Sequence, residues 1–166
     1  MWFKLISYLK FLLKSTNEHG VHSPFVFNYV TQCLYSKKKL HNSKDTNALL
    51  KSISYFNIKK IETLGNQGLQ ELMQKQLPEM QISVNPFDLI VVDHFEISTL
   101  EQWISENKLH NDSMIWVESI HKNKETLEQW QALIRSPLIT VSINMYHCGA
   151  LFIRKEQVKE HFTIRI

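Results

Sequence analysis

The sequence predicts an α/β domain of three layers, in which helices cover both faces of a mostly parallel sheet. From residue 57 onward, short apolar runs alternate with segments of helical periodicity, as in strands joined by crossover helices. The run FDLIVVDH at 87–94 is apolar almost without interruption, which is typical of a strand buried on both faces. Near the end of the chain, ITVSINMY and ALFIRK flank a turn and predict an antiparallel pair.

The N-terminal region, residues 1–56, predicts three helices, the first over the amphipathic segment 2–14. Ser23 is a good N-cap residue, and Pro24 follows at the first helical position, where its missing N–H costs nothing. A second helix should therefore run to about Tyr35. In TNALLKSISYF at 46–56, apolar residues recur at helical spacing and predict the third helix.

The remainder, residues 57–166, predicts the sheet core. Strands are expected at 59–64, 80–84, 87–94 and 113–119, and helices at 67–76, 98–109 and 123–136. The antiparallel pair occupies 139–146 and 150–155, and a last short segment lies at 161–166. We expect a single domain over residues 1–166 whose sheet has about five or six strands.

Composition limits the classes of function. The 166 residues are 43% apolar, which suffices for a core, and the formal charge is only +3. The lysine cluster at 37–39 lacks interleaved aromatic residues, so we expect no nucleic-acid partner. Cys33 and Cys148 lie far apart and outside any zinc-binding spacing, which is typical of core thiols in a reducing compartment and predicts a cytoplasmic protein.

The segment MWFKLISYLKFLLK raises the question of membrane contact. Lysines interrupt its apolar runs, which fall short of the roughly 20 apolar residues that a transmembrane helix needs. We expect its apolar side to dock on the domain's own core or on a partner, with peripheral membrane contact through residues 2–14 as the alternative. At 100° per residue the polar side comprises Lys4, Ser7, Lys10 and Lys14, and the apolar side Trp2, Leu5, Ile6, Leu9, Leu12 and Leu13.

The order of elements resembles that of class I S-adenosylmethionine-dependent methyltransferases. NEHGVHSPFVF, HNDSMIWVESIH and VSINMYHCGALFIRKEQVKEHFTIRI look like a family of O-methyltransferase-like proteins common in Bacteroidetes. The likeness covers residues 17–35 and 86–166 and is weaker over 45–70. It implies a Rossmann-like methyltransferase fold with a shortened, mostly parallel sheet, a C-terminal antiparallel hairpin and N-terminal helices. It also implies S-adenosylmethionine as the cofactor.

The resemblance implies a cofactor site that is eroded here. The family pattern after the first strand is close to E-L-G-T-S-x-G, and IETLGNQG keeps Gly65 and Gly68 but has Thr63 two residues before Gly65. Glu62 is displaced by one position, which turns it to the opposite face of a strand. The family places two more βα units before the strand matched by FDLIVVDH, where this chain has about twenty residues. Asn85 stands where a ribose-binding carboxylate is expected, so Glu62, Gly65, Gly68 and Asn85 are the candidate cofactor-binding residues.

Related catechol-type enzymes hold a divalent metal with carboxylates at two strand ends, where it acidifies the acceptor hydroxyl. Asp93 matches the first position, whereas Glu118 and Ser119 occupy a second position that is doubly acidic in the related family. The candidate metal ligands are Asp93, Glu118 and His121, and the candidate catalytic residues are Asp93, His94 and Glu118. Alternatively, these strand-end residues are solvated or cap the next helix.

The sequence therefore favours a non-catalytic or auxiliary methyltransferase-like protein that acts through protein contacts. The alternative is a minimal active S-adenosylmethionine-dependent O-methyltransferase, with a divalent metal assisting. Loss of a βα unit should leave a sheet edge less protected, which together with the first helix favours a homodimer or a fixed protein partner. His19 and His22 could act as a base or fix their own loop.

Overall fold

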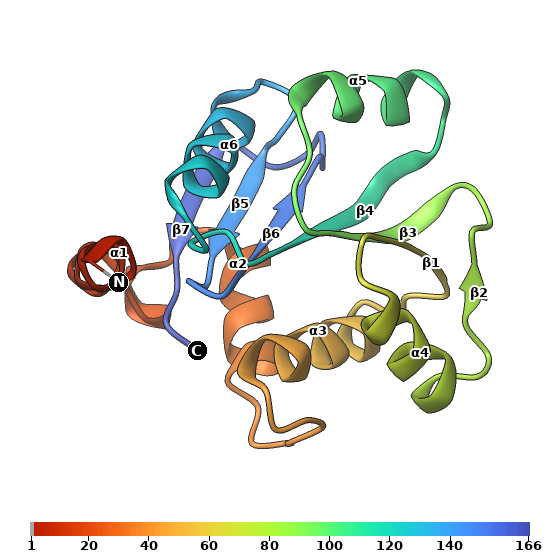
Figure 1. The fold of residues 1–166 in the computed structure, drawn as a ribbon, viewed down its shortest axis with the longest axis horizontal. Helices are drawn as coiled ribbons and strands as arrows, with labels where there is room; N and C mark the ends of the chain where they lie inside the picture. Colours follow the sequence, from red (N-terminus) through yellow and green to blue (C-terminus); the bar gives the residue numbers. More distant parts are fainter. Residues whose placement is uncertain (1) are drawn as a thin grey trace.

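The computed structural model describes residues 2–166 and contains a seven-stranded mixed sheet with helices on both faces (Figure 1). The helices are α1 (Trp2–Lys14), η1 (Glu18–Gly20), α2 (Pro24–Asn28), the π-helical η2 (Tyr29–Leu34), α3 (Lys44–Tyr55), α4 (Gln67–Gln76), α5 (Ile97–Ser105) and α6 (Lys124–Arg135). The strands are β1 (Lys60–Leu64), β2 (Gln81–Ile82), β3 (Phe87–Val92), β4 (Leu109–Glu118), β5 (Val141–Asn144), β6 (Cys148–Phe152) and β7 (Glu160–Thr163).

The strand order is β2-β1-β3-β4-β6-β5-β7. Strands β2, β1, β3 and β4 are parallel, β6 is antiparallel to both of its neighbours, and β7 is parallel to β5. The α/β class, the mostly parallel sheet and the antiparallel pair at the C-terminal end are thus confirmed.

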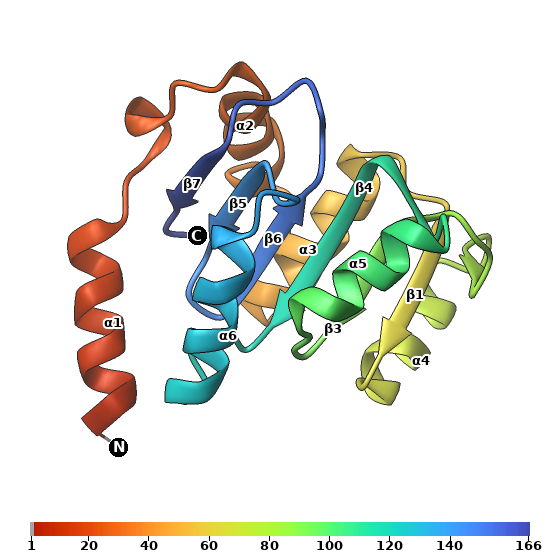
Figure 2. The ribbon, with the colours of Figure 1, turned by 90° about the horizontal axis from the view of Figure 1, so that it is seen from above.

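Two apolar cores lie on the two faces of the sheet. On one face, α2, η2, α3 and α4 cover residues such as Leu89 and Trp116, and on the other, α5 and α6 cover residues such as Ile90 and Ile115 (Figures 1 and 2). Cys33 and Cys148 are free, buried thiols, and burial raises the pKa of Cys33 to about 11. Such thiols are unreactive core residues.

Several helix ends form as their sequences predict. Ser23 Oγ accepts from the Val26 N–H, and Pro24 occupies the first turn of α2. Asn123 caps α6 in a reciprocal capping box with Thr126. Helix α4 spans Gln67–Gln76, the range expected for it.

The sheet has more strands than the sequence predicts. Seven strands form instead of about five or six, because the last short segment pairs with β5 as β7. The strand expected at 80–84 forms only over Gln81–Ile82, as β2. The helix expected at 98–109 ends at Ser105, and β4 begins at Leu109. Asn107 there has a positive φ of 53°, which reverses the chain into the strand.

The orientation of α1 on the domain is the opposite of the expected one. Ser7 and Phe11 face the domain and are buried, with Ser7 Oγ 2.5 Å from His121 Nδ1 and Phe11 against the His121 and Tyr146 rings. The Tyr146 hydroxyl donates to the Lys4 carbonyl at 3.0 Å. Docking of the aliphatic side on the domain's own core is therefore wrong, because the aromatic and polar residues His121 and Tyr146 contact the other side. Docking of that side on a partner stays a prediction. Within residues 2–166, no helix is both long and apolar enough to cross a bilayer.

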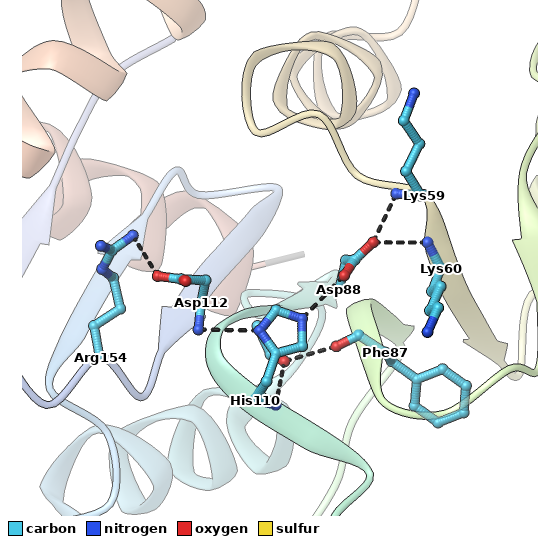
Figure 3. Close-up of polar contacts among 8 residues, drawn as sticks. Lys59, Lys60, Phe87, Asp88, His110, Asp112 and Arg154 are labelled. Carbon is cyan, nitrogen blue, oxygen red and sulfur yellow. Dashed lines mark hydrogen bonds and ion pairs between the residues drawn. The ribbon is translucent and has the colours of Figure 1, made fainter.

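Asp88 joins the amino ends of three parallel strands (Figure 3). Its Oδ2 accepts from the backbone N–H groups of Lys59 and Lys60 at 2.7 and 2.8 Å, and its Oδ1 lies 2.9 Å from His110 Nε2. The Asp112 N–H donates to His110 Nδ1, so Nε2 carries the proton and donates to Asp88. The register shifts here, since Phe87 pairs with Leu109 but Leu89 pairs with Met114. The Asp88 network thus satisfies polar groups at a β-bulge.

Burial raises the pKa of the Asp88 carboxyl, but the hydrogen bonds from the two strand N–H groups and from His110 outweigh it and hold that pKa below its usual value. A carboxyl whose pKa is depressed on folding stabilises the protein above its unfolded pKa, and this contribution is lost as the pH falls through the folded value.

We expect Asp88→Asn to lower the free energy of unfolding by about 1–3 kcal/mol at pH 7, because one amide oxygen cannot serve all three donors. The difference from wild type should shrink below about pH 4, where Asp88 itself becomes protonated. Urea unfolding at several pH values measures both effects. Asp112→Asn is the control, since its pair with Arg154 is exposed and should contribute little. Equal losses in the two variants would contradict this role for Asp88.

Candidate functional site

The candidate site lies where the strand order of the sheet reverses. Strand β2 lies on one side of β1 and β3 on the other, so the crevice outside their carboxyl ends is the position where open α/β sheets bind ligands. The pairs Leu64↔Val92 and Val92↔Val117 bring the ends of β1, β3 and β4 to one level. The residues that follow, among them Gly65 and Asp93, therefore meet at this edge.

Gly65 makes the turn after β1 and leaves room for Asp93. Its φ is +96°, a conformation that favours glycine, and an added Cβ would lie 3.3 Å from Asp93 Oδ2. Gly68 lies in the first turn of α4, and a Cβ there would meet only Asn66 Oδ1, at 3.7 Å. The geometry therefore requires glycine at position 65 but not at position 68.

Asn66 bridges the glycine turn to the end of β4. Its Oδ1 accepts from the Leu69 N–H at 3.0 Å and caps α4, while its Nδ2 donates to Glu118 Oε2 at 2.8 Å. Sequence reasoning missed this residue, although asparagine three positions before an apolar helical residue is a usual N-cap signal. The side chain fills part of the space above the turn and satisfies one carboxylate oxygen internally.

Asp93 and Glu118 form a carboxyl pair. Burial raises the pKa of Glu118, and the charge of Asp93 and a hydrogen bond with it raise it further, against the opposing effect of Asn66. A carboxyl whose pKa is raised by burial and by a neighbouring charge is a candidate general acid or base. Cys148, opposite Glu118 on β6, is fully buried with a strongly raised pKa and is unsuited to act as a nucleophile.

Two of the predicted cofactor-binding residues lie elsewhere. Glu62 and Asn85 line a cleft of about 230 Å³ together with Trp103. Trp103 belongs to the α5 side of the sheet, whereas Ile61 packs on the α4 side, so strand alternation turns Glu62 away from the glycine turn. Gly65 and Asn85 thus do not share a binding surface.

Thr63 occupies the position where the family pattern has its carboxylate. Its Oγ1 is buried and has no hydrogen-bond partner among the described residues. Alternation along β1 places Thr63 on the same face as Ile61, beside α4. This hydroxyl is thus an unpaired polar group enclosed within the domain, two residues before the turn.

The predicted metal ligands are not brought together. His121 packs beneath α1, stacked on Tyr146 at 4.7 Å with Nε2 3.0 Å from the Asn144 amide nitrogen. Burial lowers the pKa of His121. Over residues 2–166, no group of three or more His, Cys, Asp or Glu is arranged to hold a metal.

The remaining histidines are at the surface. His94 follows Asp93 and is exposed. His19 lies 3.8 Å from Glu18, and His22 is exposed at the entry to α2. Ser119 is also exposed, with its N–H donating to the His147 carbonyl at 2.7 Å. The structure thus concentrates the site's chemistry in Asn66, Asp93 and Glu118, which share contacts at the switch point.

The raised pKa of Glu118 predicts a stability effect with a definite sign. A carboxyl whose pKa rises on folding stabilises the protein at low pH, and this contribution is lost as the pH rises from the unfolded value through the folded value. Glu118→Gln should therefore raise the melting temperature by a few degrees at pH 7, because Gln keeps the bond from Asn66 and donates to Asp93. The gain should vanish below about pH 4.5.

Calorimetric melting at pH 4 and pH 7 checks this expectation, with Glu101→Gln on the exposed face of α5 as the control for net charge. A lower melting temperature for Glu118→Gln than for Glu101→Gln at pH 7 would show that the Glu118 charge stabilises the fold.

Comparison with known proteins gives no match: no family model, no curated protein and no solved structure is significantly similar to this chain. The methyltransferase resemblance of the quoted stretches therefore stays a hypothesis. Fold alone does not determine function, so the function has to be argued from the chemistry at the ends of β1, β3 and β4.

Proposed function

We propose that this chain is a methyltransferase-like protein with an incomplete S-adenosylmethionine site, which acts as a non-catalytic or auxiliary protein through contacts with other proteins. The strand order, with β6 inserted antiparallel between β4 and β5, is compatible with a Rossmann-like methyltransferase architecture that has lost one βα unit. At the site, only some of the groups that S-adenosylmethionine needs are present.

The observation that carries the proposal is the direct passage from β2 to β3. Only residues 83–86 separate the two strands, and none of them is acidic. A third βα unit and its ribose-binding carboxylate are thus missing from the place where the resemblance predicts them. Asn85, the expected substitute, lines the cleft on the α5 side. The residues present do not complete an S-adenosylmethionine site.

The polar groups of the glycine turn are also engaged with one another. Asn66 donates to Glu118 and accepts from Leu69, and the Asp93 carboxylate lies close above Gly65. A ligand entering this turn would have to displace these bonds and face two carboxyls. The polar groups at this strand end thus bond to one another, which disfavours binding of a cofactor.

The sheet edges offer little surface for a partner strand. At one edge, β2 has only two residues, and very short edge strands are poor templates for pairing. At the other edge, the Thr16 N–H donates to the Thr163 carbonyl at 2.9 Å, so the segment after α1 covers the end of β7. A homodimer or a protein partner is therefore expected to use helix surfaces, if this proposal holds.

We expect titration calorimetry with S-adenosylmethionine and S-adenosylhomocysteine, with and without Mg²⁺, to give no saturable binding tighter than a Kd of about 1 mM. A folded sample is verified by its melting transition in the same buffer. Stoichiometric micromolar binding would overturn the proposal. Gly65→Ala then serves as the matched variant, because a side chain at φ +96° should weaken binding only if the ligand sits at this turn.

A minimal active O-methyltransferase is the second candidate, and one observation favours it. Glu118, whose pKa is raised, lies beside Asp93 at the strand ends and can accept a proton from an acceptor hydroxyl. This candidate predicts methyl transfer from labelled S-adenosylmethionine to a phenolic acceptor. Asp93→Asn should then reduce the rate at least about a hundredfold, while Asp112→Asn should leave it unchanged.

A further inference from the structure

The outward face of α1 is apolar along its whole length. Its five large apolar residues lie within an arc of about 100° of the helix, opposite the docked residues Ser7 and Phe11. Figure 2 shows α1 along the outer edge of the molecule, beside α6 and β7. The exposed residues are Trp2 (78% exposed), Leu5 (54%), Ile6 (47%), Leu9 (52%) and Leu13 (88%).

The contacts of α1 fix this face toward solvent. The Ser7 contact to His121, the Tyr146 hydroxyl bond to the Lys4 carbonyl and the packing of Phe11 hold the helix in one rotation. Turning the aliphatic arc inward would break all three. The aliphatic arc is therefore exposed in the folded chain, and an exposed apolar surface of this kind indicates a binding partner or a membrane.

We propose that this outward face docks on an anionic phospholipid bilayer, with α1 lying in the plane of the interface. This proposal goes beyond the proposed function and holds whether or not S-adenosylmethionine binds. An apolar arc with a terminal tryptophan, bordered on one side by Lys10 and Lys14, is the pattern of an interfacial helix. At 13 residues, α1 is about 20 Å long, too short for the 30 Å hydrocarbon core, so it lies on the bilayer and does not cross it.

The positive charge around α1 favours an anionic surface over a neutral one. Lys4, Lys10 and Lys14 are exposed, and α1 contains no acidic residue. A cleft of about 370 Å³ between α1 and α6 is lined by Lys10, Lys14 and Arg135 together with His121 and His161, and no carboxylate is among its lining residues. This concentration of positive charge is local, since the whole chain carries only +3. Each lysine near an anionic surface adds to binding.

A second copy of the chain fits this face less well. A stable protein interface uses about 20–30 residues on each side with a polar rim, whereas this arc offers five side chains without a hydrogen-bonding group apart from the Trp2 indole N–H. Lysines on the flanks of two copies would also repel each other. Binding to a lipid surface requires neither shape complementarity nor paired polar groups.

Trp2 provides a probe within the chain. The other three tryptophans, Trp103, Trp116 and Trp130, are at most 6% exposed, so quenching by acrylamide reports mainly on Trp2. With vesicles of equal parts phosphatidylglycerol and phosphatidylcholine, we expect co-sedimentation, a shift of emission to shorter wavelengths and protection from quenching. About 1 M NaCl, where the Debye length is about 3 Å, should weaken binding strongly.

One pair of variants disrupts the apolar arc, and a second pair removes positive charge beside it. Leu9→Glu with Leu13→Glu should lower vesicle affinity at least about tenfold, whereas Val158→Glu, at a side chain 78% exposed elsewhere, should not. Lys10→Gln with Lys14→Gln should weaken binding to anionic vesicles more than Lys39→Gln does. The mutated side chains are exposed, and circular dichroism confirms that each variant is folded.

Three results would overturn the proposal. The first is no sedimentation with either anionic vesicles or pure phosphatidylcholine vesicles. The second is equal binding to both vesicle types, which would remove the role of charge. The third is a lipid-free dimer that Leu9→Glu with Leu13→Glu dissociates, seen by light scattering, which would make this face a contact between copies of the chain.

Discussion

The structure depends first on one carboxylate at the amino ends of the parallel strands. Asp88 receives the N–H groups that begin β1, and it receives His110 from the bulged start of β4. These contacts join three strands at one end, from which the ladder carries the register to the other end. Gly65, Asp93 and Glu118 are brought to one level by the same register. The Asp88 network at the amino ends of the parallel strands thus fixes the same register that aligns the residues at their carboxyl ends.

The carboxyl groups at the two ends of the parallel strands have pKa shifts of opposite sign. Donors surround Asp88, and its charged form stabilises the fold. Glu118 has one donor, Asn66, and faces a second carboxyl, so its charged form opposes folding. Groups with perturbed pKa values that do not contribute to stability are typical of functional sites, although structural networks also produce them. Glu118 is therefore the group at the carboxyl ends of the strands whose charged form the fold does not stabilise.

Local patterns predicted most of the elements and the antiparallel pairing of β5 with β6, whereas pairings between segments distant in sequence could not be predicted. The range of α4 and the buried β3 follow from periodicity and apolar runs. The bulge filled by His110 could not be predicted, because it depends on a register between segments distant in sequence. At the site, the strand-end position of Asp93 could be inferred, but the bond from Asn66 to Glu118 could not, since it joins residues 52 positions apart.

The same limit applies to the side of α1 that contacts the domain. Periodicity shows that one side of the helix is aliphatic, but it does not show whether the domain needs that side for its core. The two cores are closed by α2, η2, α3 and α4 on one face and by α5 and α6 on the other, without any of the leucines of α1. The domain has room only for Ser7 and Phe11, beside His121 and Tyr146. The aliphatic residues of α1 therefore add nothing to the internal packing, and a bilayer surface supplies the apolar environment that the folded chain does not.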